Sequence, residues 1–175
     1  MSQFVDLSHP LTNGQPSYPG DPPIELTEYK TEATGGCNLT RIALGSHHGT
    51  HLDAPYHFIS DGPRLDQIPL ERFHGPAELV DLAPGGALQP NTRLTLEMFT
   101  EHADAFQPQS RVIYRTGWSR MFGKPEFFTD LPSLTVEAAR WIAQRQIGLL
   151  GMDVPTPSTT HGHECHRRRE HERWP

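Results

Sequence analysis

The residues best suited to chemistry lie in one short stretch, 46–57, which holds four of the eleven histidines. Four side chains that can ligate a metal or move a proton alternate along it: His47, His51, Asp53 and His57. In an extended chain, every second side chain points to the same side, so these four would converge. Two imidazoles and a carboxylate suit a borderline divalent cation such as zinc, and a carboxylate can bridge two ions. The stretch predicts a metal site in preference to a strand of solvated polar side chains.

Gly49 and Pro55 interrupt regular structure within this stretch. A helix would also align His47 with His51, but glycine and proline both disfavour a helix interior. We expect these two residues to set the sharp backbone geometry that brings the ligands together. His48 breaks the alternation and is expected to face outward or to lie beside the ligands. The even positions are expected to face the core: Leu52, Ala54 and Tyr56.

A second group of four histidines lies at 161–171, about 110 residues further along the chain. Two such groups can meet in a compact domain, so a composite site is an open possibility. Cys37 and Cys165 form neither a disulfide framework nor a CxxC pair. They are expected to be structural residues, and two free thiols fit a reducing, cytoplasmic setting.

Length and composition describe an ordinary globular protein. The chain has 175 residues, of which 35% are hydrophobic and 21% charged, which fits one domain. The net charge of −6 argues against a nucleic-acid partner. No apolar stretch approaches 18 residues, and the first residues lack the pattern of a secretory signal. We therefore expect no membrane association.

Hydrophobic periodicity predicts an α/β domain. Short strands are expected at 4–7, 39–44, 78–82, 111–114 and 147–152, the last as a buried strand. Helices are expected at 95–106 and 135–146. Thr135 is the expected cap of the second helix, Glu137 suits its positive end, and its apolar stripe would be Val136, Ala139 and Ala143. Strand–helix–strand order around 111–152 favours the α/β class.

The segment HHGTHLDAPYH at 47–57 resembles the HxGTHxDxPxH motif of the cyclase family of metal-dependent hydrolases, which includes arylformamidases and isatin hydrolases. Four further segments resemble other family signatures in the same order: 4–11, 18–21, 115–118 and 151–158. The resemblance extends from about residue 4 to residue 166. It implies a swivelling β/β/α-type single domain with a mixed sheet over 1–166, followed by an atypical charged tail at 167–175.

The resemblance also assigns roles to individual residues. It implies four metal ligands: His47, His51, Asp53 and His166. His57 would be the general acid/base, and Tyr18 would pack on the substrate ring. The implied cofactor is Zn²⁺, with Mn²⁺ as the alternative, at one or two ions per chain. The implied assembly is a homodimer or homotetramer.

By this resemblance the chain would hydrolyse an aryl formamide such as N-formylkynurenine, with water activated by the metal as nucleophile. A cyclic amide such as isatin is the alternative substrate. A third hypothesis is a metal-binding domain with impaired catalysis, because the family's bridging glutamate would fall past residue 175. A second metal is then expected to bind weakly, unless Glu170 or Glu172 replaces that ligand.

Overall fold

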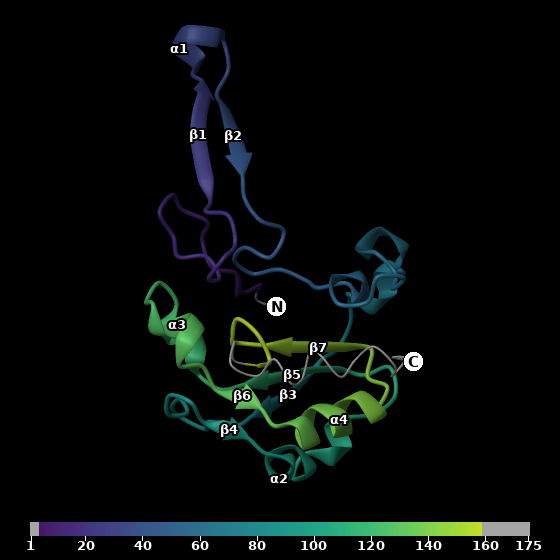
Figure 1. Cartoon of the computed structure of the whole chain (residues 1–175). Coiled ribbons are helices and arrows are strands. Elements are labelled where there is room, and N and C mark those ends of the chain that lie inside the picture. Colours follow the sequence, from purple (N-terminus) through teal and green to yellow (C-terminus); the bar gives the residue numbers. More distant parts are fainter. Residues whose placement is uncertain (1–3, 159–175) are drawn as a thin grey trace. The chain divides into compact units, whose positions relative to one another are not determined.

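The structure is a computed structural model that describes residues 4–158 (Figure 1). The chain divides into two compact units, the first ending at Ile68 and the second beginning at Pro69. The predicted ligand His166 and the tail at 167–175 lie outside the described residues. No helix within residues 4–158 is long and apolar enough to cross a bilayer.

The first unit contains an antiparallel hairpin of β1 (Glu25–Lys30) and β2 (Leu39–Ala43), joined through the short helix α1 (Glu32–Gly35) (Figure 1). The Thr31 side chain accepts a hydrogen bond from the Thr34 amide and caps α1. The strand predicted at 39–44 is confirmed as β2, whereas β1 was not predicted. Two 3-10 turns follow in this unit, Pro55–His57 and Leu65–Gln67.

The second unit is built on a three-stranded parallel sheet in the order β3 (Glu78–Asp81), β5 (Arg111–Arg115), β7 (Leu149–Met152). A smaller parallel pair joins β4 (Arg93–Leu94) to β6 (Ser133–Leu134). Its helices are α2 (Leu96–Thr100), α3 (Glu126–Thr129) and α4 (Val136–Gln144). Three 3-10 turns complete the second unit: Leu70–Arg72, Ala103–Ala105 and Trp118–Met121.

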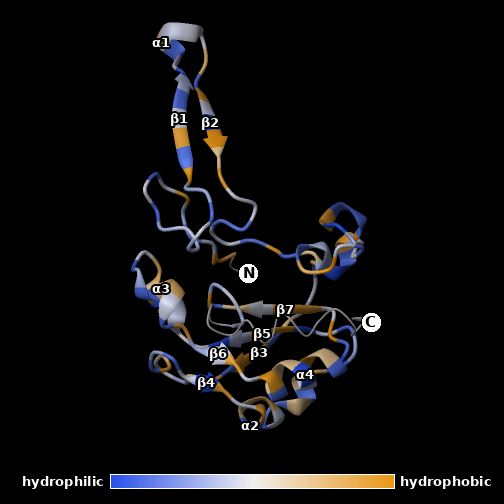
Figure 2. Cartoon of the chain, in the orientation of Figure 1, coloured by the Kyte–Doolittle hydropathy of each residue, from blue (hydrophilic) through white to orange (hydrophobic). Residues whose placement is uncertain are grey.

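The hydrophobic core lies in the second unit, where apolar residues are concentrated in the strands and the helices packed on them (Figure 2). Central strand β5 contributes Val112 and Tyr114, both without exposed surface. Phe99 of α2 stacks edge-on against Tyr114 with ring centroids 5.7 Å apart. In contrast, Ile24 is the only buried apolar side chain among residues 4–68.

The expected α/β class is confirmed, with parallel and antiparallel pairs in separate sheets of the described chain. The strands predicted at 78–82, 111–114 and 147–152 are confirmed, although the last is half-buried rather than buried. The helix predicted at 135–146 is confirmed as α4, and Thr135 caps it by accepting a hydrogen bond from the Ala138 amide. The buried positions of α4 are Ala138 and Ile142, an i, i+4 pair on one helix face. The stripe predicted at Val136, Ala139 and Ala143 is only half-buried, so the sequence placed the core-facing side of this helix incorrectly.

Two predicted elements are wrong. Residues 4–7 form no strand, and Phe4 and Leu7 are 97% and 83% exposed. The Asp6 carboxylate instead accepts hydrogen bonds from the amide and hydroxyl of Ser8, a local bond that competes with strand pairing. The helix predicted at 95–106 ends at Thr100, whose hydroxyl donates to the Glu97 carbonyl, and a separate 3-10 turn follows.

The carboxyl end of the parallel sheet is fixed by one carboxylate that follows β7. Asp153 accepts hydrogen bonds from the Thr116 amide (2.8 Å), the Thr116 hydroxyl (2.6 Å) and the Gly117 amide (2.7 Å). Gly117 has φ +73°, a left-handed conformation that favours glycine. Asp153 therefore links the end of β7 to the turn that follows β5.

Asp153→Ala should lower the free energy of unfolding by about 3 kcal/mol, because it leaves two amides and a buried hydroxyl without their charged acceptor. Asp104→Ala is the control, since Asp104 is exposed, and should change stability by less than about 0.5 kcal/mol. Urea denaturation of both variants makes the comparison. Equal midpoints would contradict the role of Asp153.

Candidate metal centre

The predicted ligands converge on a turn and not on a strand. Residues 46–50 form consecutive turns and bends, so the expected extended alternation is wrong. Gly49 has φ +67°, and a Cβ there would lie 2.7 Å from Cδ2 of Leu11. The His9 amide also donates to the Thr50 hydroxyl at 3.1 Å. Segment 9–11 therefore packs directly on the turn, and Gly49 has the sharp geometry that the sequence predicted.

This turn brings three potential ligands together. Nδ1 of His47 lies 2.6 Å from Oδ1 of Asp53, and Nε2 of His51 lies 3.2 Å from the same oxygen. One ligand atom from each of these residues lies within 4.8 Å of the others. The His51 Nδ1 is 2.8 Å from the Gly49 carbonyl, to which it donates. The turn thus sets the orientation of the His51 ring as well as its position.

The donor set of this cluster fits a divalent cation. When Nδ1 of His51 donates to Gly49, the neutral ring directs the lone pair of Nε2 at the Asp53 carboxylate. Two acceptors facing each other need a cation between them, either a proton or a metal. The hydrogen bond to Asp53 accordingly raises the pKa of His51 above its ordinary value, and the same bond lowers the pKa of Asp53. A metal ion can take the place of that proton.

His57 lies beside the cluster on the 3-10 turn Pro55–His57. Its ring stacks on His47 with centroids 3.7 Å apart and an angle of 32° between the planes. Phe58 contacts the His57 ring at 4.1 Å between centroids. Partial desolvation lowers the pKa of His57, and the neighbouring His47 lowers it further, whereas Asp53 acts in the opposite direction. The structure thus brings four of the predicted site residues together.

The loop that contains Tyr18 also interacts electrostatically with this site. Tyr18 is half-buried, and its carbonyl accepts a hydrogen bond from the Asp21 amide at 3.0 Å. Burial raises the pKa of Tyr18, with a smaller contribution from Asp21. The Asp21 charge also raises the pKa of His57, partly offsetting the effect of desolvation. Asp21 is the charged neighbour that sequence reasoning missed, although it belongs to the 18–21 signature.

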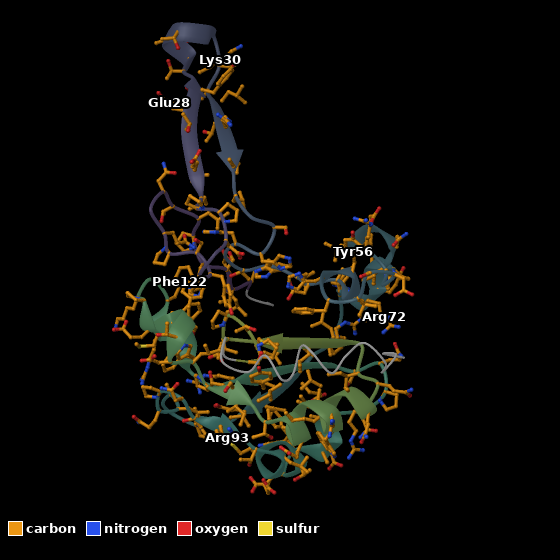
Figure 3. The ribbon with its side chains drawn as sticks, in the orientation of Figure 1. Glu28, Lys30, Tyr56, Arg72, Arg93 and Phe122 are labelled. Carbon is orange, nitrogen blue, oxygen red and sulfur yellow. The ribbon has the colours of Figure 1, made fainter. Side chains whose placement is uncertain are left out.

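The expectations for Leu52 and Tyr56 are wrong, and only one of the two alternatives for His48 is excluded. His48 is buried and does not face outward, and its Nε2 has no hydrogen-bond partner among residues 4–158. Leu52 and Tyr56 are 47% and 42% exposed and do not face a core. Tyr56, labelled in Figure 3, instead lies under the guanidinium of Arg64 at 3.8 Å from the ring centroid. The reason is the same in each case: a turn does not alternate its side chains as a strand does.

The His–His–Asp cluster could hold a metal ion, and comparisons with known proteins identify the class of enzyme. The Cyclase family model matches residues 5–158. Kynurenine formamidase of Bacillus mycoides (strain KBAB4) is 32% identical over 157 residues, which is 89% of this chain and 70% of that protein. The same enzyme of Bacillus anthracis is 31% identical over the same shares. The chain therefore belongs to the cyclase family.

Solved structures give the same result. Isatin hydrolase A from Labrenzia aggregata superposes with a TM-score of 0.77 at 26% identity, over 91% of this chain and 70% of that one. A predicted metal-dependent hydrolase from Bacillus stearothermophilus superposes with a TM-score of 0.71 at 29% identity, over 93% and 75%. The expected class of enzyme is confirmed: an amidohydrolase that acts on C–N bonds other than peptide bonds.

Asp53→Asn should lower the zinc content of the chain more than His57→Ala does. The amide loses the negative charge and one of the acceptor oxygens on which both imidazoles converge, whereas His57 lies outside the ligand cluster. Metal analysis after equilibration with zinc measures the difference. Asp66→Asn is the control at an exposed carboxylate of the same unit. Equal metal content in the Asp53 and His57 variants would contradict the ligand assignment.

Proposed function

We propose that the chain hydrolyses an aryl formamide such as N-formylkynurenine, using a metal held by His47, His51 and Asp53. The observation that carries the proposal is the ligand cluster with His57 stacked on His47 at 3.7 Å. The kynurenine formamidases at about 30% identity support the choice of a formamide. Zn²⁺ is the proposed metal, with Mn²⁺ as alternative, because imidazole and carboxylate suit both.

The number of metals depends on residues beyond the described part of the chain. The three clustered ligands are enough for one catalytic-type zinc, which commonly has three protein ligands. We propose His166 as a further ligand, on the resemblance alone, and thus one or two ions per chain. Zinc titration of the His166→Ala variant tests this assignment, which predicts loss of any second equivalent while the first remains.

When bound, the cation supplies Lewis acidity toward the carbonyl oxygen and makes water acidic near neutral pH. The protein residues orient and transfer protons. Asp53 holds Nδ1 of His47, and the Gly49 carbonyl holds Nδ1 of His51, which leaves Nε2 of His51 turned to the cluster. His57, on the face of the His47 ring, is placed to take a proton from water and to return it to the departing amine.

Substrate recognition is assigned to the loop at 18–21. A half-buried tyrosine can offer an aromatic face to a substrate ring. The Asp21 charge of the same loop acts to raise the pKa of His57, which supports a role of this loop beside the proposed acid/base. We therefore propose that the substrate ring packs on Tyr18.

A cyclic amide such as isatin is the second candidate substrate, and the structural likeness to isatin hydrolase A favours it. Parallel kinetics on N-formylkynurenine and isatin decide between the two, by the larger kcat/KM. A metal-loaded chain with no turnover of either would favour the third hypothesis, a metal-binding domain with impaired catalysis. A cytoplasmic location and assembly as a homodimer or homotetramer stay predictions.

Formamide hydrolysis should disappear on chelation and return on addition of zinc. His57→Ala should keep the metal but lower kcat by about 100-fold or more, the usual contribution of a general acid/base. His74→Ala is a matched control, because it removes a histidine from the second unit, and it should keep full activity. Undiminished turnover in the His57 variant, with metal content intact, would exclude the proposed role.

Tyr18→Ala should raise KM several-fold, since an aromatic face on a substrate ring contributes about 1 kcal/mol. The metal content should not change, because Tyr18 is not among the clustered ligands. Tyr18→Phe keeps the ring and is the control, with KM close to that of the unmodified chain. A loss of metal in Tyr18→Ala would instead show that the residue has a structural role.

A further inference from the structure

Arg64 carries a positive charge that no carboxylate within residues 4–158 neutralises. The ion pairs of this part of the chain are His47–Asp53, His51–Asp53 and Arg115–Asp81. Two acidic residues lie close to Arg64 in the sequence, Asp61 and Asp66, yet neither pairs with it. The guanidinium instead lies over the ring of Tyr56, with its carbon atom 3.8 Å from the ring centroid.

The backbone around this contact is held by hydrogen bonds and close packing. The Tyr56 amide donates to the Pro63 carbonyl at 3.2 Å. The Arg64 amide donates to Oε1 of Gln67 at 2.8 Å. A Cβ at Gly62 would lie 3.0 Å from the amide nitrogen of Tyr56, so the segment before Arg64 packs directly on the turn that carries Tyr56. The guanidinium therefore has a defined position although its side chain is exposed.

A guanidinium in contact with an aromatic face keeps its capacity to bind an anion. Its five N–H donors lie in the plane of the group, in a fork that matches the two oxygens of a carboxylate. The ring stabilises the cation and restricts the long side chain, which lowers the entropy lost when an anion binds. Arg64 on Tyr56 thus has the properties of a preorganised carboxylate anchor.

The anchor starts from the same turn as the proposed acid/base. Tyr56 precedes His57 on the 3-10 turn Pro55–His57. Successive side chains of such a turn are about 120° apart, so the two residues point in different directions from one short segment. Desolvation lowers the pKa of His57 most, and four charged groups also act on it: His47, Asp53, His51 and Asp21. The Arg64 guanidinium is not among them, so it is placed to bind a remote group and not to take part in proton transfer.

We propose that Arg64 binds a carboxylate of the substrate, so that the chain prefers aryl formamides with an anionic side arm to neutral ones. This inference rests on the proposed formamide hydrolysis and specifies its substrate class. N-formylkynurenine has such a carboxylate several bonds away from its formamide, whereas isatin is neutral and has none. The net charge of the chain is −6, which disfavours an anion, so recognition of a carboxylate depends on a local cation.

Arg64→Gln tests the anchor with two substrates that differ in charge. The KM for N-formylkynurenine should rise about tenfold with kcat unchanged, because a hydrogen-bonded charge pair is lost. The KM for the methyl ester of N-formylkynurenine should change less than about twofold, measured in both cases by release of formate. Arg41→Gln makes the same charge change at an exposed residue of β2 and should leave both KM values unchanged. An equal change for both substrates, or no change for the acid, overturns the proposal.

Tyr56 is tested as the platform of the guanidinium. Tyr56→Leu removes the ring and should raise the KM for N-formylkynurenine about two- to fivefold, the contribution of an exposed cation–π contact. Tyr56→Phe keeps the aromatic face and should match the unmodified chain. Raised ionic strength screens an exposed charge pair, so it should raise the KM for the acid and not that for the ester. Equal KM values in Tyr56→Leu and Tyr56→Phe would exclude the platform.

Equilibrium binding separates this inference from the proposed function. Kynurenine, the amine that remains after the formyl group is removed, keeps the carboxylate and can be titrated into the zinc-loaded chain whether or not a formamide is turned over. Arg64→Gln should weaken kynurenine binding about tenfold and that of its methyl ester less than about twofold. This difference without any formamide turnover would contradict the proposed function alone. Equal losses of affinity for acid and ester, or no binding of kynurenine to the unmodified chain, would overturn the role of Arg64.

Discussion

The candidate site depends on one backbone turn. His47 and Asp53 are six residues apart in the sequence, yet their side chains meet at 2.6 Å because Gly49 adopts a left-handed conformation between them. A side chain at position 49 would be strained and would also collide with Leu11. The turn therefore couples the ligands to the segment at 9–11, and through the Gly49 carbonyl it also fixes the ring of His51. The position of the cluster and the orientation of the His51 ring follow from this single constraint.

The candidate site and the main hydrophobic core belong to different units of the chain. Core side chains such as Phe99, Val112 and Tyr114 all belong to the second unit, whereas Ile24 is the only buried apolar side chain in residues 4–68. The segment with the ligands is held instead by polar contacts, among them those of Thr50 with His9 and Asn13 with Leu26. The His47, His51 and Asp53 side chains are accordingly partly exposed, which leaves carboxylate and imidazole accessible to a metal and to water.

Sequence patterns predicted elements well where local signals and packing agree. Strand β5 and helix α4 are such cases, since apolar periodicity, the Thr135 cap and core burial all act in the same direction. Residue types and spacing also identified the ligand cluster, but the geometry was predicted for the wrong reason. The predicted alternation of side chains assumes an extended chain. The left-handed conformation of Gly49 produces a turn instead, in which His48 is buried and after which Leu52 is exposed. Strand β1 and the effect of Asp21 on His57 depend on contacts between distant segments, which no local pattern encodes.

The hairpin and the metal cluster are joined by a short piece of chain. Strand β2 ends at Ala43, and the Gly45 carbonyl already accepts a hydrogen bond from the His48 amide in the ligand turn. The antiparallel register places Ala43, the last residue of β2, directly opposite Glu25 of β1, so the residues leading into His47 start from a defined position. A backbone held at that point has fewer conformations to lose when the ligands become ordered around a metal. The hairpin therefore contributes to the metal centre without supplying any ligand.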